Sequence, residues 1–170
     1  MQIQAGRYKG RRVKTVANAP YRPTTSIVRK SLFDILGDLS GYHILDLYAG
    51  SGILGFEASS RGAESVTFVE TSMRVVSLLK MNGSLFKESQ FSYIRMDALK
   101  YLDKCESFDL IIADPPYQNS ETDLVIKKSL TRLKEDKFFI LESSPREFSI
   151  SPSRVKLYGD TQLTFWRNTK

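Results

Sequence analysis

Residues 43–55 read HILDLYAGSGILG, an apolar run that gives way to a glycine-rich loop and then to a second apolar segment. Gly50, Gly52 and Gly55 match G-x-G-x-x-G, a pattern that has meaning where it follows a strand and opens a helix, as it does here. Glycines at 50 and 52 permit a tight turn and a close approach to a ligand, and the helix start offers free N–H groups. We therefore predict a strand at 43–48, a cofactor-binding loop, and a helix at 53–61.

A second loop of this kind ends the stretch FDLIIADPPY at residues 108–117. Its apolar run is nearly continuous, which is typical of parallel strands covered by helices on both faces. Open α/β sheets bind ligands where such strands end. The remaining pattern predicts strands at 65–70, 90–96, 137–142, 154–158 and 162–167, and helices at 71–86, 97–103 and 120–133.

The last two predicted strands are separated only by Gly159-Asp160-Thr161. This connection is too short for a crossover, so the two strands must be antiparallel. The fold class is therefore α/β, with a parallel sheet that ends in an antiparallel pair.

Composition fits a single domain in a reducing compartment. The chain has 170 residues, 41% of them hydrophobic, and one cysteine, Cys105, which has no internal partner for a disulfide. Its apolar runs are too short to span a bilayer, and its first residues lack the apolar core of a signal peptide. These features predict a cytoplasmic protein without a membrane partner.

The excess positive charge lies at the N-terminus. No acidic residue precedes Asp34, whereas eight basic residues do: Arg7, Lys9, Arg11, Arg12, Lys14, Arg22, Arg29 and Lys30. Such a segment can be a solvated arm, but the interleaved Tyr8 and Tyr21 add possible stacking surfaces and favour a polyanionic partner.

We expect residues 1–22 to form a basic hairpin and a proline-containing linker, and residues 23–170 to form the second domain. The hairpin strands are predicted at 3–5 and 12–16. A helix capped by Thr24 or Thr25 then runs to about Asp38, with Arg29 and Lys30 near its exposed side.

Two carboxylates follow the next strands of the pattern. Glu70 ends the second strand, where an acidic residue can accept hydrogen bonds from ribose hydroxyls of either a nicotinamide dinucleotide or S-adenosylmethionine. Asp97 follows the third strand and can bind an adenine amino group, cap the next helix, or do both.

Asp114-Pro115-Pro116-Tyr117 is the motif that discriminates between these cofactors. Two prolines stiffen the backbone, so that the Asp114 carboxylate and the Pro115 carbonyl can point at one amino group. Two acceptors that hold both N–H bonds favour a pyramidal nitrogen, and Tyr117 can stack on an extruded base. The motif therefore predicts methyl transfer to an exocyclic amine of a nucleobase, by positioning and electrostatics and without a metal.

These motifs together resemble the class I S-adenosylmethionine-dependent methyltransferases, and more narrowly the RsmD-type bacterial 16S rRNA guanine-N2 methyltransferases. The resemblance covers nearly the whole chain, and its narrower part rests on the basic segment at 5–11 followed by Arg22-Pro23-Thr24. It implies a Rossmann-like sheet of order 3-2-1-4-5-7-6 whose seventh strand is antiparallel.

The resemblance also implies residue roles and partners. Asp46, Gly50 and Gly52 would bind the methionine part of the donor, Glu70 its ribose, and Asp97 with Ala98 its adenine. Asp114, Pro115 and Tyr117 would hold the target guanine, and Arg7, Lys9, Arg11, Arg12 and Arg22 would bind RNA. The product would be S-adenosylhomocysteine, and the substrate 16S rRNA within a small-subunit assembly particle, met by a monomeric enzyme.

Other functions explain fewer residues. An amino-methyltransferase for another base, such as adenine N6 in DNA, shares the Asp-Pro-Pro-Tyr motif, although the chain lacks an insert long enough for a DNA-recognition domain. A nicotinamide-dependent dehydrogenase leaves that motif and the basic segment unexplained, and a non-catalytic RNA-binding module leaves both ligand loops unexplained. With His43 as the single histidine and Cys105 as the single cysteine, the sequence predicts neither a zinc site nor a thiolate nucleophile.

Overall fold

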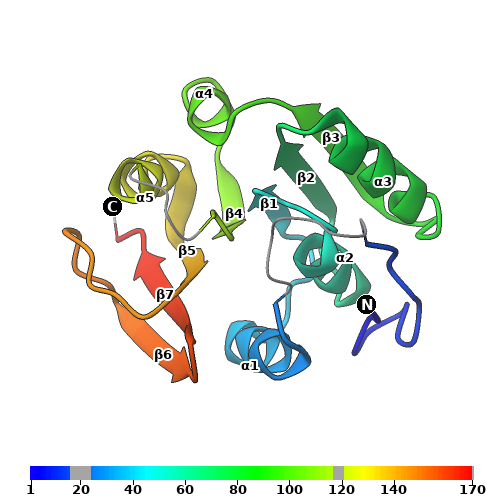
Figure 1. The fold of residues 1–170 in the computed structure, drawn as a ribbon, viewed down its shortest axis with the longest axis horizontal. Helices are drawn as coiled ribbons and strands as arrows, with labels where there is room; N and C mark the ends of the chain where they lie inside the picture. Colours follow the sequence, from blue (N-terminus) through cyan, green and yellow to red (C-terminus); the bar gives the residue numbers. More distant parts are fainter. Residues whose placement is uncertain (16–23, 117–120, 170) are drawn as a thin grey trace.

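The computed structural model describes residues 1–15, 24–116 and 121–169. Within these residues seven strands form one sheet in the order β3-β2-β1-β4-β5-β7-β6, which confirms the order that the resemblance implied (Figure 1). The strands are β1 (His43–Leu47), β2 (Ser65–Glu70), β3 (Gln90–Arg95), β4 (Phe108–Ala113), β5 (Leu133–Ser143), β6 (Arg154–Tyr158) and β7 (Thr161–Arg167). The pairs from β3 to β5 are parallel, and β7 is antiparallel to both β5 and β6.

Helices cover both faces of this sheet (Figure 1). α1 (Ser26–Leu36), α2 (Ile53–Ser60) and α3 (Met73–Gly83) lie on one face, and α4 (Ala98–Leu102) and α5 (Thr122–Leu130) lie on the other. Side chains of β1 divide between the two layers, since Ile44 belongs to the core under α1–α3 and Leu45 to the core under α4 and α5. No helix in the described parts of the chain is long and apolar enough to cross a membrane.

Helix starts follow the capping residues of the sequence. The side chain of Thr25 accepts a hydrogen bond from the Val28 N–H, and those of Ser72 and Asp97 cap α3 and α4 in the same way. The ends were predicted less well. α1 ends at Leu36 with Gly37 as its C-cap, and α3 ends at Gly83 rather than at residue 86.

β5 begins earlier than the sequence pattern predicted. It starts at Leu133 rather than at residue 137, and α5 accordingly ends at Leu130. The pairing register with β4 shifts between Phe108 and Leu110, and Asp136 has a positive φ of 59°. This irregularity places polar residues at the start of a strand, where a search for apolar runs does not find them.

The N-terminal ribbon, residues 1–15, turns back on itself and packs on α2. Its ends pair at Met1 with Val13 and at Ile3 with Arg11, so the pairing lies nearer the start of the chain than the predicted strands 3–5 and 12–16. The only regular bridge among the described residues of this segment joins Gln2 and Arg12. Ile3 and Val13 are 2% exposed and belong to the same core as α1–α3.

A buried carboxylate anchors the ribbon. Glu57 of α2 is fully buried and accepts hydrogen bonds from the Gln4 and Ala5 N–H groups, at 2.8 and 3.1 Å, and from Nε of Arg61 at 2.9 Å. Arg29 also points into this region and is 4% exposed, so the expectation that it lies on the exposed side of its helix is wrong. The physical reason is that the ribbon covers that side of α1.

Candidate functional site

The two motif loops lie side by side because their strands are neighbours. In the parallel pair β1–β4, Leu47 is opposite Ala113, so Tyr48 and Asp114 both follow directly at one edge of the sheet. A small cavity of about 30 Å³ between the loops is lined by Met1, Thr24, Asp46, Tyr48, Ala49, Gly50, Ser51, Ile53, Leu54 and Asp114. The structure thus brings Asp46, Gly50 and Asp114 together, as the sequence predicted.

The glycine-rich loop has an unusual backbone. Gly50 and Gly52 have φ values of 52° and 77°, and Tyr48, which is not a glycine, has a φ of 56°. At Gly52 a Cβ atom would meet Cδ2 of Leu79 at 2.5 Å and Cε2 of Phe56 at 2.7 Å. The second glycine of the pattern therefore allows the loop to pack on α2 and α3, in addition to its left-handed turn.

Asp46 lies beneath this loop and is 3% exposed. Its Oδ2 accepts a hydrogen bond from the Gly55 N–H at 3.0 Å, close to the start of α2. Burial raises the pKa of Asp46 to about 8; the Gly55 hydrogen bond opposes this shift and the charge of Glu70 adds to it. A cationic group placed here would favour the ionised form.

Glu70 fixes the loop at the tip of β2. Its Oε2 accepts a hydrogen bond from the Gly50 N–H at 3.3 Å, and its Oε1 accepts one from the Thr71 N–H at 2.8 Å. A carboxylate has about four acceptor positions, so these bonds leave capacity for a ligand hydroxyl.

Asp97 and Ala98 follow β3 at the same edge of the sheet. Oδ1 of Asp97 accepts a hydrogen bond from the Lys100 N–H at 3.1 Å, which confirms its capping role and leaves its second oxygen for other donors. Ala98 is buried, and the Met96 N–H donates to the Glu70 carbonyl, so the β2 and β3 tips are joined.

Glu142 is a site residue that the sequence reasoning missed. It follows Leu141, which is opposite Ala113 of β4, so Glu142 and Asp114 occupy neighbouring strand tips. Glu142 is 4% exposed and accepts a hydrogen bond from Oγ1 of Thr24 at 2.7 Å. Burial, then the charges of Glu142 and Asp46, raise the pKa of Asp114 well above its usual value. The signal in the sequence was an acidic residue at the end of the apolar run 138–141.

The rest of the Asp-Pro-Pro-Tyr motif is described only in part. Pro115 is buried and Pro116 is exposed, whereas Tyr117 lies outside the described residues. Arg22, which the sequence assigned to RNA binding, also lies outside them.

The remaining predicted RNA-binding residues lie on the outer side of the N-terminal ribbon. Arg7, Lys9, Arg11 and Arg12 are exposed. Arg7 pairs with Glu88 at 3.4 Å, and the Arg11 guanidinium lies 5.0 Å from the Tyr8 ring centre. Tyr8 itself packs edge-on against Phe86, so part of the stacking surface expected of it is used within the protein.

The histidine and the cysteine lie away from these loops. His43 is exposed and pairs through Nδ1 with Oγ of Ser65. Cys105 is buried, and burial raises the pKa of its thiol. Among the described residues no group of histidine, cysteine and carboxylate side chains could hold a metal ion.

Comparison with known proteins places this geometry in a family. The family model described as "Conserved hypothetical protein 95" matches residues 1–167. YlbH of Bacillus subtilis is 35% identical over 98% of each chain. Ribosomal RNA small subunit methyltransferase D of Buchnera aphidicola is 32% identical over 92% of this chain and 84% of its own length. The chain belongs to the RsmD-type methyltransferase family.

The structural comparison agrees. The yhhF protein of Escherichia coli superposes with a TM-score of 0.86 at 25% identity, covering 99% of this chain and 98% of that protein. The RsmD-type family match and this superposition both include the N-terminal ribbon, so the ribbon belongs to the family fold.

Proposed function

We propose that this chain transfers a methyl group from S-adenosylmethionine to the exocyclic N2 amine of a guanine in 16S rRNA. The observation that carries the proposal is the meeting of a glycine-rich cradle and the Asp114-Pro115-Pro116 turn at adjacent strand tips. Membership of the RsmD-type family supports the rRNA substrate.

The chemistry of the cradle suits a cationic donor. Asp46, Glu70, Asp114 and Glu142 all lie at the tips of neighbouring strands. S-adenosylmethionine carries a sulfonium and an ammonium group, which these carboxylates would stabilise. The pyrophosphate of a nicotinamide dinucleotide would instead meet like charge, which argues against the dehydrogenase alternative.

We assign the donor contacts from this arrangement. Asp46, Gly50 and Gly52 would hold the methionine part, Glu70 the ribose, and Asp97 with Ala98 the adenine. When bound, the donor supplies an electrophilic methyl group on sulfur. The loop would orient that group toward Asp114, the nearest acidic residue of the opposite loop that lines the same cavity.

On the acceptor side, the Asp114 carboxylate and the Pro115 carbonyl would accept the two N–H bonds of the guanine amine, and Tyr117 would stack on the base. Aligning the nitrogen lone pair in this way lowers the barrier by orientation. As the new C–N bond forms, the nitrogen loses a proton. Asp114 is suited to accept it because its raised pKa makes its carboxylate a better base than an ordinary aspartate.

The cellular setting is part of the same proposal. We infer that a monomeric enzyme meets rRNA in a small-subunit assembly particle in the cytoplasm. Arg7, Lys9, Arg11, Arg12 and Arg22 would contact RNA phosphates, and residues 1–22 would be the RNA-binding segment attached to the catalytic part, residues 23–170.

Two sets of variants test the assignment. Glu70→Ala should weaken S-adenosylmethionine binding by about 1.5–3 kcal/mol in calorimetry, because a charged acceptor is lost. Asp114→Ala and Tyr117→Ala should leave donor affinity largely intact but strongly reduce methyl transfer to guanine in 16S rRNA at saturating RNA. Near wild-type rates for both acceptor variants would rule out this role for the motif, and transfer to adenine in DNA instead would show a different substrate.

A further inference from the structure

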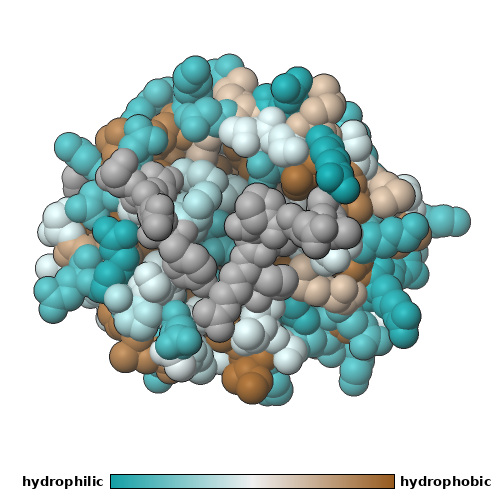
Figure 2. Space-filling view, in the orientation of Figure 1, coloured by the Kyte–Doolittle hydropathy of each residue, from teal (hydrophilic) through white to brown (hydrophobic). Residues whose placement is uncertain are grey.

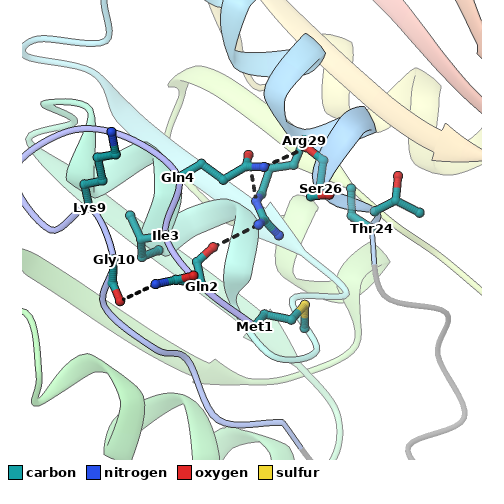
Figure 3. Close-up of a pocket in the computed structure, with 10 residues that line it drawn as sticks. Met1, Gln2, Ile3, Gln4, Lys9, Gly10, Thr24, Ser26 and Arg29 are labelled. Atoms are coloured by element: carbon teal, nitrogen blue, oxygen red, sulfur yellow. Dashed lines mark hydrogen bonds between the residues drawn. The ribbon is translucent and has the colours of Figure 1, made fainter.

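A groove of about 700 Å³ lies between the N-terminal ribbon and the start of α1 (Figure 3). Its walls are ribbon residues 1–4, 9 and 10 on one side, and residues 24–26 with Arg29 on the other. Met1 and Thr24 also line the small cavity beside Asp46 and Asp114. The groove therefore opens directly beside the site described above, and its volume is that of a pocket for a small ligand.

A buried guanidinium forms part of this groove. Nη2 of Arg29 donates to the Gln2 carbonyl at 2.9 Å and Nε donates to Oε1 of Gln4 at 3.3 Å, as the dashed lines in Figure 3 show. Its nearest carboxylate is Glu57 at 3.8 Å, and Glu57 is also paired with Arg61 at 2.9 Å. Two cations thus share one anion, which leaves one excess positive charge in a buried cluster.

The groove and the adjoining loops have opposite charge character. None of the described residues that line the groove is acidic, and Lys9 adds a second, exposed cation. The cavity next to it has Asp46 and Asp114 in its wall. The molecule therefore offers a negative site for a cation and, beside it, a positive site for an anion.

We propose that this groove binds the phosphate-bearing nucleotide that neighbours the methylated guanosine in the RNA chain. The inference rests on the proposed function and adds to it a defined place for the substrate strand. A buried excess charge is costly until an opposite charge neutralises it, and a phosphodiester supplies that charge. Phosphate contacts of this kind fix the register of a nucleic acid on a protein.

A carboxylate introduced at Ser26 tests the groove without disturbing the fold. Ser26 is exposed, lines the groove and begins α1, and a negative charge in the first turn stabilises a helix. Ser26→Glu should nevertheless weaken binding of a fluorescein-labelled single-stranded oligoribonucleotide severalfold in fluorescence anisotropy. Lys9→Gln should weaken it too, and should reduce the slope of log affinity against log salt by about one.

Ser151→Glu is the matched control, because Ser151 is exposed on the connector before β6 and outside the groove. It changes the net charge equally and should leave RNA affinity within about twofold, since exposed charges beyond a Debye length are screened. Affinity for S-adenosylmethionine should be unchanged in all three variants.

The outcomes separate the groove from the proposed function. If Ser26→Glu and Lys9→Gln bind RNA like the wild type, or no worse than Ser151→Glu does, the groove is not a phosphate site, while wild-type methylation of 16S rRNA would keep the proposed function intact. If the wild type methylates no rRNA, the proposed function fails, and the same binding series still decides whether the groove holds RNA.

Discussion

At the scale of single residues, acidic side chains at the two edges of the sheet have opposite electrostatic surroundings. At the amino edge, burial would raise the pKa of Asp109, but hydrogen bonds from Nζ of Lys134 and the His43 N–H outweigh it and lower the pKa. At the carboxyl edge, Asp46 and Asp114 have raised pKa values. The charge that their carboxylates lack is the charge that the donor brings.

Asp46 should make donor binding depend on pH. With a pKa of about 8 it is mostly protonated at pH 6, and a bound cation requires the ionised form. Affinity for S-adenosylmethionine should therefore rise by up to about tenfold per pH unit between pH 6 and 8 and then level off. Titration calorimetry from pH 6 to 9 measures this. Asp46→Asn should remove the slope, whereas an equally flat profile in the wild type would exclude Asp46 as a contact of the donor cation.

The same group should also affect folding. A carboxyl whose pKa is raised in the folded state binds its proton there more tightly than in the unfolded state. The free energy of unfolding should therefore fall as pH rises from about 4 to about 8. Asp46→Asn should thus melt above the wild type at pH 8 and close to it at pH 4, which thermal denaturation at the two pH values checks as a control on fold integrity.

At the scale of elements, the docking of the N-terminal ribbon on α2 depends on one glycine. Gly6 has a φ of 80°, and a Cβ atom there would lie 1.8 Å from the Ser60 carbonyl oxygen. This close approach lets the Arg7 N–H donate to that oxygen at 2.8 Å, while the Tyr8 N–H donates to Oγ of Ser60 at 2.9 Å.

Gly6→Ala should therefore cost far more stability than Gly10→Ala. Both glycines have left-handed backbones, at φ 80° and 86°, so both variants lose about 1 kcal/mol from that source. Only at position 6 does the new methyl group meet backbone, since at position 10 the nearest atom is Nε2 of Gln2 at 3.7 Å. We expect a loss of about 3 kcal/mol or more for Gly6→Ala in urea denaturation. Equal losses in the two variants would mean that the ribbon does not dock as described.

Prediction from the sequence worked where one periodicity governed a segment. The apolar runs at 65–70 and 108–113 gave strands with the observed bounds, and the three-residue connection at 159–161 gave the antiparallel pair. It was wrong where tertiary packing decides. The polar start of β5 joins the sheet through a register shift, and Arg29 is buried by a ribbon that its own helix does not reveal.

The site shows the same division. The tips that carry Asp46, Glu70, Asp97 and Asp114 could be placed because a parallel sheet brings its carboxyl ends to one edge. Glu142 and Thr24 could not, because their hydrogen bond joins residues 118 positions apart, and a single sequence carries no sign of it. The left-handed Tyr48 was likewise invisible, since the turn that requires it contains glycines that could have taken that role.

At the scale of the whole molecule, charge is divided between two regions. The chain has a net charge of +6, and its first thirty residues hold eight cations and no acid, so the remainder is slightly negative. The face seen in Figure 2 is mainly hydrophilic around its rim, and its apolar residues form separate small groups. A polyanion is therefore attracted chiefly to one end of the chain.

RNA binding should fall steeply with salt through this region. Replacing Arg7, Lys9, Arg11 and Arg12 together with glutamine should flatten the slope of log affinity against log salt by about three, if most of them meet phosphates. S-adenosylmethionine affinity should not change. The control replaces four exposed cations elsewhere, Lys104, Lys127, Arg154 and Lys156, with glutamine. Equal slopes for the two quadruple variants would mean that overall charge, rather than the ribbon, attracts the RNA.

The order of the last strands has a consequence for biosynthesis. β7 lies between β5 and β6 although it follows both in the chain, so β6 has no partner until β7 is made. During translation, at about 5–20 residues per second, the free side of β5, with its buried Phe139, Ile140 and Leu141, therefore stays unpaired until Thr161–Arg167 emerge. An open apolar strand invites pairing with other chains. The interval between the synthesis of β5 and that of β7 is thus when the nascent protein most needs a chaperone.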